Sequence, residues 1–162
     1  MRLILGVDPG LNRCGWGVIA ADGARMTHVA HGVLTPASDA SLAARLAELA
    51  LLLEAVVAAQ QPHEVAVEET YVNVNARAAL TLGQARGVAL ASCARAGLPV
   101  AEYAPATIKK ALVGNGQAEK DQVAFMVRRL LPTAGAVAAD AADALACAIC
   151  HAAHRGWRSR IG

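Results

Sequence analysis

The spacing of apolar positions changes several times along the chain, and each change marks a different expected element. The apolar run at residues 3–7 predicts a short buried strand. Residues 16–20 and 25–34 predict two further strands, and the Asp22-Gly23 pair between them is a strong signal for a hairpin. We therefore expect the first three strands to pair antiparallel.

Helical spacing begins near residue 41. Apolar residues then recur every three or four positions, at Leu42, Leu46, Leu49, Leu53 and Val56. This pattern predicts an amphipathic helix over 41–60, which Pro62 ends. Beyond it, we expect strands at 64–68 and 100–103 and helices at 75–96, 107–112, 118–131 and 138–154. The order βββαβαβααα predicts one α/β domain, with a mixed five-stranded sheet flanked by helices on both faces.

Composition supports a folded domain and excludes several classes of protein. Of the 162 residues, 56% are hydrophobic and only 17% are charged, a composition that does not fit a disordered chain. The four cysteines lack the paired spacing of a zinc site, so we expect buried reduced thiols. Neither a signal peptide nor an apolar run of ~18 residues is evident, which predicts a cytoplasmic protein.

Four acids occupy the most apolar surroundings of the chain. Asp8 closes the first strand and Glu68 closes the fourth, while Asp140 and Asp143 share one face of the last helix. Carboxylates brought together repel one another unless a cation holds them. Their hard oxygen ligands suit Mg²⁺ or Mn²⁺, and two such ions ~4 Å apart can activate a water for phosphodiester hydrolysis.

Each acid also has an ordinary structural explanation. Asp8, before Pro9 and Gly10, could simply form a turn. Glu68 could face water at the end of a strand, and Asp140 could cap the last helix. The argument for a metal site rests on the four acids occurring together.

Other residues are weaker candidates. Tyr71 stands in a polar loop close to Glu68 and could stack on an unpaired base. Candidate phosphate contacts are Arg77, Lys109, Lys120 and Lys110. His151 lies too far along the last helix to share a metal with Asp140, so we expect it to lie on the surface without a functional role.

Small residues recur along one face of the second long helix, at Gly83, Gly87 and Ala91. A flat face of this kind allows close approach by another helix, from the same chain or from a second subunit.

Five segments, in this order, closely resemble the RuvC family of Holliday junction resolvases, within the RNase H-like superfamily. They are Leu5-Gly6-Val7-Asp8-Pro9-Gly10, Val67-Glu68-Glu69-Thr70-Tyr71, Leu82-Gly83-Gln84-Ala85-Arg86-Gly87, Val113-Gly114-Asn115-Gly116 with Ala118-Glu119-Lys120, and Ala139-Asp140-Ala141-Ala142-Asp143-Ala144-Leu145-Ala146. The resemblance implies an RNase H-like nuclease domain over residues 1–156, followed by a short basic tail at 157–162.

The resemblance also implies an activity, a cofactor and partners. A homodimeric Mg²⁺-dependent endonuclease would nick a four-way DNA junction symmetrically, in recombination and repair. Its metal-binding catalytic acids would be Asp8, Glu68, Asp140 and Asp143, although some family members carry His at the position of Asp140. Tyr71 matches a position that is usually Phe and is implicated in junction disruption. Lys109 and Lys120 match basic positions near the scissile strand, and the branch-migration proteins RuvA and RuvB would be partners.

Three other functions remain open at this point. One is a related RNase H-like nuclease that acts on structured RNA, and another is a junction-binding protein without activity. The third is an actin-like nucleotide-binding domain, for which 162 residues leave too little room.

Overall fold

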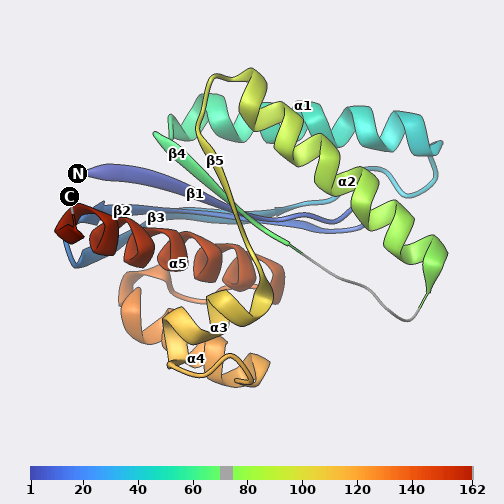
Figure 1. Ribbon diagram of the computed structural model, residues 1–162. Helices are drawn as coiled ribbons and strands as arrows, with labels where there is room; N and C mark the ends of the chain where they lie inside the picture. Colours follow the sequence, from blue (N-terminus) through green and yellow to red (C-terminus); the bar gives the residue numbers. More distant parts are fainter. Residues whose placement is uncertain (70–74, 162) are drawn as a thin grey trace.

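A five-stranded mixed sheet forms the centre of the molecule (Figure 1). The computed structural model describes residues 1–69 and 75–161. The strands are β1 (Arg2–Asp8), β2 (Cys14–Asp22), β3 (Arg25–Leu34), β4 (Glu64–Glu68) and β5 (Val100–Tyr103), in the sheet order β3-β2-β1-β4-β5. The first three strands pair antiparallel, whereas β1 pairs with β4, and β4 with β5, in parallel. The predicted sheet is confirmed.

Helices cover both faces of this sheet. On one face lie α1 (Leu42–Gln60) and α2 (Ala76–Arg95) (Figure 1). On the other face α5 (Ala139–Ile161) lies against the strands, with α3 (Pro105–Val113) and α4 (Lys120–Leu130) outside it. A short 3₁₀ turn, Pro132–Ala134, leads into the segment before α5. The α5 helix continues past residue 154, its predicted end, because no proline stops it there.

The hydrophobic core has two parts, one on each face of the sheet, because side chains along a strand point alternately to the two faces. Leu5 and Val7 of β1 pack toward α1 and α2, and Ile4 packs toward α5. Successive side chains of a strand point to opposite faces, so this split follows directly from the apolar run that predicted β1. Within the described residues, no helix is long and apolar enough to cross a bilayer.

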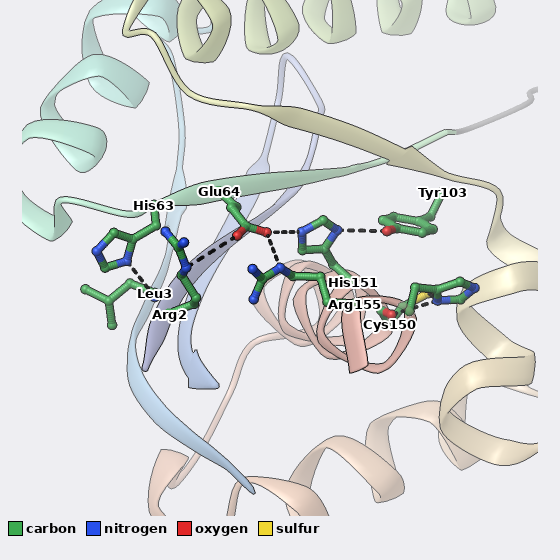
Figure 2. A network of polar contacts seen from close by, with 9 residues as sticks. Arg2, Leu3, His63, Glu64, Tyr103, Cys150, His151 and Arg155 are labelled. Atoms are coloured by element: carbon green, nitrogen blue, oxygen red, sulfur yellow. Dashed lines mark hydrogen bonds and ion pairs between the residues drawn. The ribbon is translucent and has the colours of Figure 1, made fainter. Parts of the chain in front are cut away.

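A network of polar contacts joins α5 to the beginning of β4 (Figure 2). Glu64 accepts a hydrogen bond from His151 Nε2 at 2.7 Å and forms an ion pair with Arg155, whose Nε lies 2.9 Å from the same carboxylate. The other ring nitrogen of His151, Nδ1, lies 2.8 Å from the Tyr103 hydroxyl. His151 is therefore buried, and the surface role predicted for it is wrong. The face of α5 that carries His151 is the face that packs on the sheet.

Candidate active site

Asp8 and Glu68 meet because β1 and β4 are parallel neighbours. Val7 of β1 is the register partner of Val67 of β4, so the residues that end the two strands lie side by side. Both side chains are half-buried, and they lie close enough for the charge of Glu68 to raise the pKa of Asp8. The strand-end placement predicted from the sequence is what brings the pair together.

Three glycines, which we call the glycine seam (Gly6, Gly15 and Gly17), bring α5 down onto the sheet. Gly15 stands opposite Asp8 in the β1–β2 register, and Gly6 stands opposite Gly17. A Cβ atom at Gly15 would overlap the carbonyl oxygen of Asp140, and one at Gly6 would overlap that of Ala144. The helix backbone thus rests directly on the strand backbone, which any side chain here would prevent.

This close approach delivers the two aspartates of α5 to the strand ends. Asp140 is the second residue of α5, so it does not cap the helix. Asp140 and Asp143 both raise the pKa of Asp8 through their charges, which places all four predicted acids in one electrostatic cluster. Each of the four is half-buried, so none is a freely solvated surface charge.

Crowding and burial shift the protonation of this cluster. Burial is the largest cause of the rise in the pKa of Asp8 to about 8, followed by the charges of Glu68, Asp143 and Asp140. Burial and then the charge of Asp143 raise the pKa of Glu68 to about 7. The pKa of Asp143 is raised as well, chiefly by burial. These groups resist carrying their negative charges together, and a nearby cation would relieve that cost.

Basic side chains already approach two of the acids. Arg13 Nε, in the β1–β2 loop, lies 2.6 Å from Asp140 Oδ2. Lys120 Nζ, at the start of α4, lies 3.2 Å from Asp143 Oδ2, and that carboxylate raises the pKa of the lysine. The positive charge of Lys109 lowers the pKa of Glu68 and so offsets part of the rise caused by burial.

Two of the four acids share one small pocket of about 60 Å³ with two lysines. Its lining includes Glu68, Asp143, Lys109 and Lys120. Carboxylates with raised pKa values beside two lysines can bind a divalent cation together with a phosphate group.

The donor set fits a hard divalent cation in its chemistry. Within residues 1–69 and 75–161, however, no three His, Cys, Asp or Glu side chains are arranged to hold one ion directly. The ion pairs explain this arrangement, because Arg13 and Lys120 draw the two α5 carboxylates toward themselves.

The other predicted contacts divide between two places. Lys109 and Lys120 lie in the pocket with the acids, whereas Arg77 lines a separate pocket at the start of α2. Tyr71 lies outside the described residues. Sequence reasoning missed Arg13 and the glycine seam. Gly17 lies in the predicted strand at 16–20 and Gly15 lies just before it, and this alternate spacing is a signal that could have revealed a close helix contact.

Comparison with known proteins agrees with this geometry. A sheet in this order, flanked by helices, is that of the RNase H-like class of nucleases. The family model "Crossover junction endodeoxyribonuclease RuvC" matches residues 4–151. The chain belongs to the RuvC family, as its sequence motifs predicted.

Individual relatives match over almost their whole length. Proteins described as crossover junction endodeoxyribonuclease RuvC include one from Hyphomonas neptunium, 57% identical over 98% of this chain and 95% of its own length. The one from Caulobacter vibrioides is 55% identical over 98% of this chain and 94% of its own. Thermus thermophilus RuvC in complex with a Holliday junction substrate matches with a TM-score of 0.89, at 30% identity over 98% of both chains.

Proposed function

We propose that this protein resolves four-way DNA junctions by paired phosphodiester hydrolysis, with Asp8, Glu68, Asp140 and Asp143 as its metal-binding catalytic acids. The observation that carries the proposal is the meeting of these acids, from two strand ends and one helix, in a family of junction endonucleases. Cytoplasmic action on chromosomal DNA, in recombination and repair, belongs to the same proposal.

We propose Mg²⁺ as the cofactor, with Mn²⁺ as a substitute. When bound, the metal would supply Lewis-acid stabilisation and an activated water. Asp8 and Glu68 would hold it between β1 and β4, and the α5 aspartates would complete its ligands. The raised pKa values of Asp8 and Glu68 support this assignment, because a cation there would offset the repulsion that raises them.

The lysines have a separate part in the proposed reaction. Lys109 and Lys120 line the pocket with Glu68 and Asp143, where they would hold the scissile phosphate and neutralise charge that develops on it. A phosphate that draws Lys120 away would also free Asp143 for the metal. Tyr71 would stack on a base at the crossover, and Arg77 would contact the DNA backbone.

We also propose a homodimer joined through α2. Cβ atoms at Gly83 and Gly87 would meet nothing within 4 Å in the described chain, and Leu80 on the same face is 65% exposed. This small-residue face therefore has room for the α2 helix of a second copy. Two such copies would present two sets of acids to one junction, as symmetric nicking requires. RuvA and RuvB remain proposed partners on family grounds.

The test is cleavage of a labelled four-way DNA junction with and without Mg²⁺. Asp8→Asn should abolish nicking while junction binding is retained, because the change removes a metal ligand but little volume. Asp22→Asn, at the opposite end of the sheet, is the matched control and should cut normally. Wild-type cleavage by Asp8→Asn would refute the assigned site. Equal cleavage of linear duplex or structured RNA would refute the junction as substrate.

A further inference from the structure

A second, larger pocket lies beside the acids, at the point where α1 and α2 begin. We call it the basic groove, and its volume is about 590 Å³. The polar side chains that line it are Asn12, Arg13, Arg45, Asn75, Arg77 and Thr81. They come from the β1–β2 loop, from α1 and from the start of α2, so the fold gathers them from three separate stretches of chain.

The charged side chains that line the groove are all basic. Three of its lining residues are arginines, and among the described residues that line it none is acidic. Both α1 and α2 begin here, and neither has an acidic residue in its first turn. Helix N-termini carry partial positive charge that acidic side chains often offset. Because both first turns lack such residues, no acidic side chain of these turns offsets the positive charge of the two helix ends.

Contacts with neutral acceptors hold Arg45 in place. Its Nη2 donates to the Asn12 side-chain oxygen at 2.8 Å and to the Leu11 carbonyl oxygen at 3.3 Å. These bonds orient the guanidinium without cancelling its charge. Arg45 Nε is buried and makes no hydrogen bond within the described chain, which leaves an unmet donor beside the groove.

The start of α2 adds further donors. Asn75 Oδ1 accepts from the main-chain N–H groups of Arg77 and Ala78, at 2.9 and 3.2 Å. With its oxygen used as the helix cap, the Asn75 side chain offers its NH₂ group as a donor. Arg77 follows at once on the exposed side of the helix. Arginine, amide and hydroxyl donors at a helix N-terminus are the groups that bind phosphate.

Arg13 joins the groove to the acids, because it lines the groove and also pairs with Asp140 at 2.6 Å. We propose that the basic groove binds the sugar–phosphate backbone of the DNA strand that continues from the scissile phosphate. Arg13, Arg45 and Arg77 would contact successive phosphates. The inference rests on the proposed function and adds a backbone-binding surface to the four acids.

Salt dependence of junction binding tests the proposal directly. Binding of a labelled four-way junction would be measured in EDTA between 50 and 200 mM salt for wild type, Arg77→Gln and Arg45→Gln/Arg77→Gln. Removal of one arginine–phosphate interaction should lower the slope of log K against log[salt] by about 0.9. Over this fourfold range of salt, the double variant should therefore lose about 12-fold less affinity than wild type.

A matched control separates direct contact from a general effect of charge. Arg95→Gln removes an exposed arginine 18 residues further along α2, about 27 Å from Arg77. Its slope should equal that of wild type. Arg77 bonds to the side chains of Asn75 and Thr81 through its main-chain atoms, so Arg77→Gln leaves these bonds intact and tests the groove even if Arg45→Gln disturbs the loop.

Two results would overturn the proposal: an unchanged slope for Arg77→Gln, or an equal decrease for Arg95→Gln. Cleavage of the same junction by wild type in Mg²⁺ tests the proposed function separately. If wild type cuts while the slopes do not change, only the groove fails. If the slopes decrease but wild type does not cut, the groove stands as a DNA site and the proposed function fails.

Discussion

Gly15→Ala tests whether the glycine seam positions the proposed catalytic acids. The added Cβ would overlap the Asp140 carbonyl oxygen and lie 2.9 Å from the Ala141 nitrogen. Both are backbone atoms of α5, so no side-chain rotation can relieve the contact. Since nonbonded carbon atoms pack at ~3.5–4.0 Å, the first turn of α5 must move away from β2 by roughly 1 Å.

This displacement should affect stability and activity to different degrees. Overpacking of a close contact costs about 1–3 kcal/mol, which for a chain of this length lowers Tm by about 3–9 °C. A misplacement of ~1 Å at catalytic groups costs about 10²-fold in rate. We therefore expect cleavage at saturating junction to fall about 100-fold at a temperature where Gly15→Ala remains folded, with junction affinity in EDTA unchanged.

Gly17→Ala provides the matched comparison on the same strand and the same face. Its Cβ would lie 2.5 Å from Cδ2 of Leu145, a buried side chain rather than the helix backbone. Thermal melts should show a comparable loss of stability, but the cleavage rate should fall much less because the acids stay in place. Equal rate losses for the two variants, or a wild-type rate for Gly15→Ala, would refute a positioning role for Gly15.

Two further predictions concern protonation and the buried network. Because the folded-state pKa values of Asp8 and Glu68 are raised to about 8 and about 7, the folded state holds protons that the unfolded state releases above about pH 4, so metal-free stability should fall as pH rises from about 4 to 8. Urea unfolding in EDTA should show this decrease in the free energy of unfolding. Asp8→Asn should make the decrease smaller, and Mg²⁺ should largely remove it. A free energy of unfolding that rises from about pH 4 to 8 would contradict the raised pKa values. Tyr103→Phe removes the hydroxyl bonded to His151 and should cost about 1 kcal/mol in the same unfolding assay, with normal cleavage; a cleavage defect at full stability would instead give the network a part in the reaction.

The sequence predicts those features of the site that depend on local pattern. The apolar run before Asp8, the run before Glu68 and the i, i+3 spacing on the last helix are each visible within a few residues. These patterns place each acid on its element. They also predict the sheet, because parallel pairing follows from strands separated by helices.

Features that depend on distant pairing are absent from any local pattern. Arg13 and Asp140 are 127 residues apart, and nothing near either residue indicates their ion pair. His151 shows the same limit in the core, because its partner Glu64 is 87 residues away. A histidine near the end of the predicted helix at 138–154 resembles a surface residue until the face that packs on the sheet is known.

The four acids and the basic side chains beside them are held by different kinds of structure, and under the proposed function this difference has a consequence. Backbone packing fixes the acids, since α5 rests on glycines of β1 and β2 and cannot move without a change in the sheet. Long basic side chains such as Arg13 and Lys120 approach the acids from a loop and from a helix start. These side chains can exchange a carboxylate for a phosphate at little cost, because both partners are anions. Under the proposed function, fixed acids with exchangeable basic partners would let the arrival of DNA release Asp140 and Asp143 for metal binding, which would couple activation of the site to the presence of substrate.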